Sequence, residues 1–105
     1  MTLILSFAVG PATAQDLDDI SVAGMVTDER GSLVPGASIT LMAETTNVTR
    51  RVTSDDAGRY RVVELASGAY RLLATADGFA PTEITNLSAA SGQVLKVDVT
   101  LRPGG

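Results

Sequence analysis

The strongest constraint on the fold is an alternation of apolar and polar residues with a period of two. It is clearest near the C-terminus, where apolar residues from Leu95 to Leu101 alternate with polar residues from Lys96 to Arg102. Successive side chains on a strand point to opposite faces, so each such run predicts a strand with one buried face. No window carries the i, i+3, i+4, i+7 stripe of an amphipathic helix. The chain is therefore expected to be all-β.

Short segments rich in glycine and aspartate separate the alternating runs and predict the turns. Glycine supplies positive φ, and aspartate accepts hydrogen bonds from its own turn backbone. Turn signals every 8–12 residues, roughly, between about seven short strands predict an antiparallel Greek-key β-sandwich. The turn segments are Asp28–Gly31, Pro35–Gly36, Asp55–Gly58, Ala66–Gly68, Asp77–Gly78 and Ser91–Gly92.

The same alternation predicts which side chains fill the core between the two sheets. Burying each large side chain contributes about 1.5–3 kcal/mol before the loss of chain entropy is subtracted. The expected core residues are Val22, Val26, Ile39, Leu41, Val52, Tyr60, Val62, Leu65, Tyr70, Leu72, Phe79, Leu95, Val97, Val99 and Leu101.

Composition limits the chemistry that such a sandwich can carry. The 105 residues include no histidine and no cysteine. Disulfides, thiolate or imidazole metal sites, and Ser-His-Asp or Cys-His catalysis are therefore excluded. The formal charge of −4 and the presence of a single lysine argue against a nucleic-acid surface, which needs a basic stripe. We expect no enzymatic activity, no cofactor and no nucleic-acid partner.

Residues 1–15 differ from the rest of the chain because they carry no charged side chain. Their apolar run, Leu3 to Val9, is about half the length that spans a bilayer. Ala12-Thr13-Ala14 is a small-x-small site typical of signal peptidase cleavage. These features predict a signal peptide over 1–15, truncated at its start because no basic residue precedes the apolar run. The alternative is a hydrophobic N-terminus that packs on the domain.

Cleavage at this site would leave a mature chain that starts with an acidic tail over residues 16–19. The sequence thus predicts export to the periplasm, the outer membrane or the cell surface. No transmembrane segment is expected in the mature chain.

Four short blocks succeed one another along residues 20–102. They read GMVTD with Gly31 and VPGA, then TSDDAGRY, then LASGAY, and finally DGF. In this order they resemble the carboxypeptidase regulatory-like domain family. The resemblance implies a seven-stranded transthyretin-like or prealbumin-like sandwich over 20–102, with a linker or tail over 103–105. The structural motif residues it implies are Gly24, Asp28, Gly31, Pro35, Gly36, Thr53, Asp55, Gly58, Tyr60, Gly68, Tyr70, Gly78 and Phe79.

The resemblance implies a non-catalytic accessory domain. Similar domains often lie at the N-terminus of TonB-dependent receptor-like outer-membrane proteins, directly after the signal peptide. The implied role is a monomeric spacer or docking module, whose partner is another protein or the rest of a larger chain. The alternative is a carbohydrate-binding module, because starch-binding domains share this general sandwich. Phe79, beside Gly78 at a loop, is the candidate sugar contact.

Three further features of the sequence could have a functional or structural role: an acidic loop, the single lysine and the two tyrosines. Asp55 and Asp56 form an acidic loop that could offer oxygen ligands to calcium. The loop lacks the full alternating calcium pattern, and turn aspartates usually accept local hydrogen bonds. A Lys–Asn isopeptide bond, as in related stalk domains, is not expected, because alternation places Lys96 on the solvent face. Tyr60 and Tyr70 are expected in the core, each with its hydroxyl on a backbone partner.

Overall fold

The computed structural model describes residues 19–104, which form nine strands. The predicted signal peptide, and the acidic tail up to residue 18, lie outside the described residues. Within 19–104 there is no long apolar helix of the kind that could cross a membrane. The strands are β1 (Ile20–Asp28), β2 (Ser38–Ala43), β3 (Thr49–Thr53), β4 (Arg59–Leu65), β5 (Gly68–Thr75), β6 (Phe79–Ala80), β7 (Thr82–Ala89), β8 (Val94–Lys96) and β9 (Val99–Pro103).

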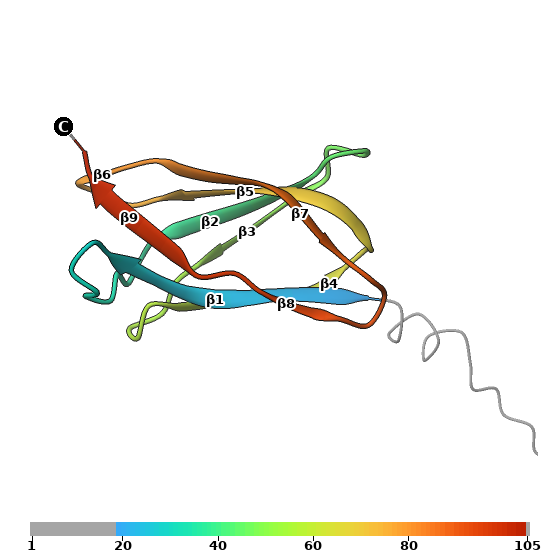
Figure 1. Cartoon of the computed structure of the whole chain (residues 1–105), viewed down its shortest axis with the longest axis horizontal. Coiled ribbons are helices and arrows are strands. Elements are labelled where there is room, and N and C mark those ends of the chain that lie inside the picture. The colour runs from blue at the N-terminus through green and yellow to red at the C-terminus, as the bar shows by residue number, and fades with distance from the viewer. Residues whose placement is uncertain (1–18, 105) are drawn as a thin grey trace, which may run out of the picture.

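The strands form two sheets that pack face to face (Figure 1). One sheet has the order β4-β1-β9-β6, with β8 also paired to β1, and the other has the order β3-β2-β5-β7. The predicted all-β sandwich is confirmed. Residues 19–104 contain nine strands rather than seven, because the last alternating run divides into β8 and β9 and because the two-residue strand β6 is added.

The direction of pairing at β1 differs from the antiparallel prediction. β1 is antiparallel to β4, but it is parallel to β8 and β9, with Val22 opposite Leu95 and Val26 opposite Val99. Only a short hairpin forces its two strands to be antiparallel. Almost the whole domain separates β1 from β8 and β9, so their connection leaves the direction free. The alternation pattern reports which face is buried and carries no information on strand direction.

The core lies between the two sheets, and most of its predicted members are buried. The exceptions are Val52, Phe79 and Leu95, which are only partly buried and pack against the core from its margin. Four further apolar side chains complete the core, namely Ile20, Val34, Ala37 and Ala74.

The last predicted strand is interrupted at Val97–Asp98, where the Val97 carbonyl accepts a 2.6 Å hydrogen bond from the buried hydroxyl of Tyr60. Gly24 on β1 allows this close approach, because a Cβ there would lie 1.8 Å from the Val97 carbonyl oxygen. The Asp98 carboxylate accepts the Met25 N–H at 3.0 Å, so the β1 amide keeps an acceptor where the strand is interrupted. Two motif residues far apart in sequence, Gly24 and Tyr60, thus meet at one point.

Replacing Tyr60 by Phe is expected to lower the free energy of unfolding by about 1–3 kcal/mol, because the buried Val97 carbonyl loses its partner. Burial, and secondarily the Asp98 charge, raises the pKa of the Tyr60 hydroxyl above its ordinary value. Because the pKa of the Tyr60 hydroxyl is higher in the folded state, the protonated hydroxyl contributes fully to the free energy of unfolding at pH values below its unfolded-state pKa of about 10. That contribution is lost as pH rises through the folded-state pKa.

Urea unfolding of both proteins at about pH 8 and about pH 11 measures this effect. We expect the difference in the free energy of unfolding between wild type and Tyr60→Phe to be smaller by about 1 kcal/mol at the higher pH. Other titrating groups are common to both proteins and cancel in the comparison. A difference that stays constant or widens with pH would contradict the buried, protonated hydroxyl.

Candidate functional site

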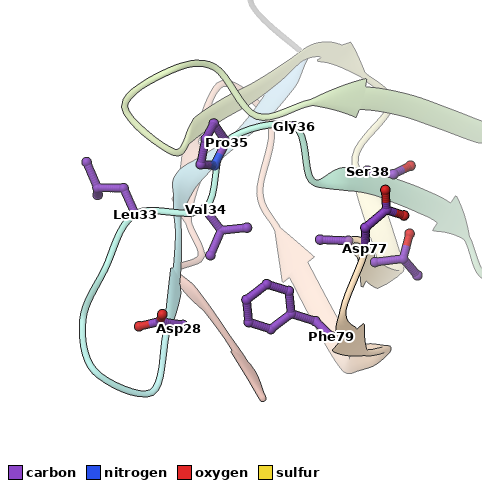
Figure 2. Close-up of a pocket in the computed structure, with 10 residues that line it drawn as sticks. Asp28, Leu33, Val34, Pro35, Gly36, Ser38, Asp77 and Phe79 are labelled. Atoms are coloured by element: carbon purple, nitrogen blue, oxygen red, sulfur yellow. The ribbon is translucent and has the colours of Figure 1, made fainter. Parts of the chain in front are cut away.

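A cleft of about 640 Å³ lies between the β1–β2 loop and the turn that leads from β5 to β6. Figure 2 shows the Phe79 ring pointing from the β6 side towards Val34 of the opposite loop. Both apolar and acidic residues line the cleft. The lining residues are Asp28, Leu33, Val34, Pro35, Gly36, Ser38, Thr75, Ala76, Asp77 and Phe79.

Asp28 shapes one wall of the cleft from the end of β1. Its Oδ1 accepts the backbone N–H groups of Arg30 and Ser32, each at 2.9 Å. Gly31 adopts a positive φ of 84° in the same turn, and its N–H donates to the Asp28 carbonyl at 3.0 Å. The carboxylate therefore holds the start of the β1–β2 loop in one conformation, as the turn chemistry predicted.

Asp55 repeats this arrangement in the β3–β4 loop. Its Oδ1 accepts the N–H groups of Ala57 and Arg59, each at 2.9 Å, and Gly58 has a φ of 74°. Asp56 is exposed beside it. Among residues 19–104, no cluster of three or more potential metal-ligating side chains gathers here or elsewhere. The Asp55 carboxylate thus makes the local hydrogen bonds that are usual for a turn aspartate.

Ser54 fixes the Pro35–Gly36 turn, which forms part of the same cleft wall. Its buried hydroxyl accepts the Ala37 N–H and donates to the Val34 carbonyl, both at 2.8 Å. Its backbone carbonyl also accepts the Gly36 N–H at 3.0 Å. One hydroxyl therefore satisfies two backbone groups that would otherwise be buried without partners.

Replacing Ser54 by Ala is expected to lower the free energy of unfolding by about 1–3 kcal/mol, because both backbone groups lose their partner. Thr53→Ala is the matched control: Thr53 is the exposed neighbour on β3, and its loss should change stability by less than about 0.5 kcal/mol. Urea denaturation measures both variants. Equal losses for the two would show that the buried hydroxyl does not hold the turn.

Phe79 forms the opposite wall and is held in place by the C-terminal strand. It is partly buried against the core, and it pairs with Pro103 of β9. The Gly104 N–H then donates to the Gly78 carbonyl at 2.9 Å. Strand pairing therefore continues past Arg102, one residue further than the sequence predicts, and it supports the loop that carries the aromatic ring.

Tyr70 and Gly68 lie away from this cleft, at a second hollow of about 360 Å³. The partly buried Tyr70 hydroxyl donates to the Ala66 carbonyl at 2.6 Å, so both tyrosines lie in the core and bind backbone partners as predicted. Burial raises the pKa of Tyr70, while the positive charge of Arg50 opposes the shift. Lys96 is exposed, as the alternation predicted.

The structural roles of three residues, Ser54, Asp98 and Arg50, were not predicted from the sequence. Ser54 could have been found, because the alternation that starts at Val52 places it on the inward face. Asp98 carried no such signal, since an aspartate on a solvent face is the ordinary expectation. Arg50 also lies on the inward face; its guanidinium donates to the carbonyls of Val63 and Glu64 at 3.0 and 3.3 Å, and so links β3 to β4.

The cleft has the chemistry of a binding surface. Its lining combines one aromatic residue and several aliphatic residues with two acidic residues, Asp28 and Asp77, and two hydroxyl-bearing residues, Ser38 and Thr75. This combination suits a polar molecule with one apolar face. The chain has no histidine or cysteine to serve as an imidazole base or a thiolate nucleophile.

These features define a small β-sandwich domain whose glycine- and aspartate-containing turns build a cleft at one end. The chain belongs to the carboxypeptidase regulatory-like domain family, whose model matches residues 21–102. The match includes the motif glycines and aspartates whose geometry is described above.

The chain covers only a small part of the length of two similar proteins. Serine-aspartate repeat-containing protein D of Staphylococcus aureus strain Newman is 37% identical over 60 residues, which are 56% of this chain and 4% of that protein. The Bacillus anthracis TIE protein has a TM-score of 0.67 at 18% identity, over 81% of this chain and 17% of that one.

Two other solved structures share the fold. A candidate carbohydrate-binding protein of Bacteroides uniformis ATCC 8492 has a TM-score of 0.65 at 21% identity, over 80% of this chain and 41% of that one. Catechol 1,2-dioxygenase of Acinetobacter radioresistens has a TM-score of 0.68 at 11% identity, over 90% of this chain and 55% of that one. At these identities the likeness extends to the fold alone.

Proposed function

We propose that this domain is a non-catalytic spacer and docking module within a longer exported protein. One observation carries the proposal: the first strand, β1, and the last strand, β9, run in parallel. The chain therefore enters the domain at one end and leaves it at the other (Figure 1). A domain of this kind holds whatever is attached at its N-terminal end apart from the chain that follows its C-terminal end.

The length of the spacer can be derived from the strand register. Val26 lies opposite Val99, the first residue of β9, so the path from Ile20 to Pro103 follows β1 as far as Val26 and then all of β9 in the same direction. At the usual rise per strand residue, this separation is about 33 Å. The small share that this chain covers in the relatives, 4% and 17%, supports its role as one module among several. An N-terminal position in a TonB-dependent receptor-like protein is the setting we propose.

The intact mass of the endogenous protein in its source cells tests the proposal. We expect a species far larger than 10.8 kDa that contains residues 20–102, and we expect added protease to reach it from outside the cytoplasm. A free species near 10.8 kDa less a leader, or a species confined to the cytoplasm, would overturn the proposal.

Carbohydrate binding is the second candidate function, and the Phe79 cleft favours it. An aromatic ring next to carboxylates and hydroxyls is the arrangement that can stack on a sugar ring while binding its hydroxyls. The fold shared with a candidate carbohydrate-binding protein of Bacteroides uniformis supports this alternative.

Glycan-array binding of wild type, Phe79→Ala and Val94→Ala tests the second candidate. Val94 is the matched control, an apolar side chain that is 58% exposed and outside the cleft lining. We expect a bound glycan to be lost with Phe79→Ala and kept with Val94→Ala, with both variants folded by circular dichroism. Wild type that binds no glycan, or binding that survives Phe79→Ala, would exclude the cleft as a sugar site.

A further inference from the structure

The segment Val94–Leu101 lies parallel to β1 along almost its entire length. Ser21, Val22 and Ala23 pair in order with residues 94–96 of β8, and Val26, Thr27 and Asp28 pair in order with residues 99–101 of β9. On its other side β1 is paired with β4. β1 is thus an interior strand with hydrogen-bonded partners on both sides.

The interruption between β8 and β9 does not break this contact. The Val97 N–H donates to the Ala23 carbonyl at 2.8 Å, and the Asp98 carboxylate accepts the Met25 N–H at 3.0 Å. The Tyr60 hydroxyl holds the Val97 carbonyl from the core side at 2.6 Å. The bonds between β1 and Val94–Leu101 therefore continue through the junction.

The direction of this contact determines how it responds to tension. A pull on the N-terminal end of β1 and the C-terminal end of β9 slides the two parallel strands past each other, because these ends lie at opposite ends of the sandwich (Figure 1). The interstrand hydrogen bonds of a parallel pair are evenly spaced and slanted, and they run between the strands rather than along the direction of the pull. They share the load and must break nearly together. If the strands were pulled apart from the same end, the bonds would break one after another.

We infer that this domain is a tension-resisting module, in which β1 and Val94–Leu101 form a shear clamp between the two ends of the domain. The inference rests on the proposed spacer and docking function, because tension reaches the clamp only when both ends of the domain are held, whether by the chain itself or by a docked partner. It goes beyond that function, since a spacer need not resist force. The clamp responds to a mechanical force applied through the two ends of the domain, and it does not require a bound molecule.

Single-molecule pulling on the full 105-residue chain tests the clamp with two pairs of handles. The chain has no cysteine, so introduced cysteines are unique attachment points. Asp19→Cys with Arg102→Cys loads the strands in shear. Arg30→Cys with Arg102→Cys loads the same interface from one end, since the 3.8 Å ion pair between Arg102 and Glu29 places these positions side by side.

At equal loading rate, we expect the unfolding force in the shear geometry to be about twofold higher or more than in the peeling geometry. Equal forces, or a lower force in shear, would overturn the inference. The proposed spacer function has a separate readout, which is the mass of the endogenous protein. A free-standing endogenous chain whose unfolding force is higher in shear would contradict the spacer function and support the clamp. A large multidomain protein whose domain unfolds at equal force in both geometries would support the spacer function and contradict the clamp.

A variant at the junction links the force to named atoms. Asp98→Ala removes the acceptor of the Met25 N–H and should lower the shear force more than the peeling force. Asp56→Ala, at an exposed turn residue outside the clamp, should leave both forces unchanged. A merely structural effect of Asp98 would lower both forces in proportion, and that result would count against the clamp.

Discussion

Gly24→Ala is expected to lower the free energy of unfolding by about 3–5 kcal/mol, which is exceptional for the addition of one methyl group. The new Cβ would lie 1.8 Å from the carbonyl oxygen of Val97 and 2.6 Å from its carbonyl carbon. Both atoms belong to the backbone, so no side-chain rotation relieves the clash. The backbone must move, and it would carry the Val97 carbonyl away from the Tyr60 hydroxyl that donates to it.

Ser21→Ala on the same strand is the control for Gly24→Ala. Ser21 is only partly buried, and alanine there should change stability by no more than about 0.5 kcal/mol. Urea denaturation, with circular dichroism of the native baseline, measures both variants. A small loss of unfolding free energy with Gly24→Ala would mean that the Val97 carbonyl does not approach Gly24 this closely.

Gly58→Val is the second large effect and is expected to cost about 3–5 kcal/mol. A β-branched residue is a strong outlier at positive φ, and Gly58 has a φ of 74°. Its Cβ would also lie 2.8 Å from the Val26 carbonyl oxygen. That carbonyl accepts the Val34 N–H at 2.9 Å, so its displacement would also disturb the wall of the cleft.

Gly36→Val separates the two causes of the Gly58 effect. Gly36 has nearly the same φ, 75°, but a Cβ there would meet no atom within 4 Å. It should therefore show only the backbone strain, about 1–2 kcal/mol. The melting temperature and the urea midpoint of both variants give the comparison. Equal losses would show that the contact with Val26 adds nothing.

Much of the sandwich could be predicted from local patterns. Alternation identified the buried face of each strand, because the side-chain period of two does not depend on which strand lies alongside. The turn glycines were predictable for the same local reason: Gly31, Gly36, Gly58, Gly68, Gly78 and Gly92 all have positive φ. Asp28 and Asp55 also act within their own turns, where each carboxylate reaches backbone groups two and four residues ahead.

Gly24 shows where local patterns stop. The sequence places it on the inward face of β1, beside Val22 and Val26, but does not explain why a glycine is needed there. Its reason is the carbonyl of Val97, near the opposite end of the domain's sequence. Phe79 is a second case, because alternation assigned it to the core. Only the pairing of β6 with β9 leaves it at the core margin, in the wall of a cleft.

The sequence by itself thus determined the class of the fold, the turns and most of the buried face, since each depends on a few neighbouring residues. Three features were decided only by the tertiary structure. They are the parallel pairing of β8 and β9 with β1, the junction of Gly24, Tyr60, Val97 and Asp98, and the cleft around Phe79. These depend on contacts between segments that are far apart in the sequence. No local pattern records such contacts, because the connecting chain leaves both register and direction open.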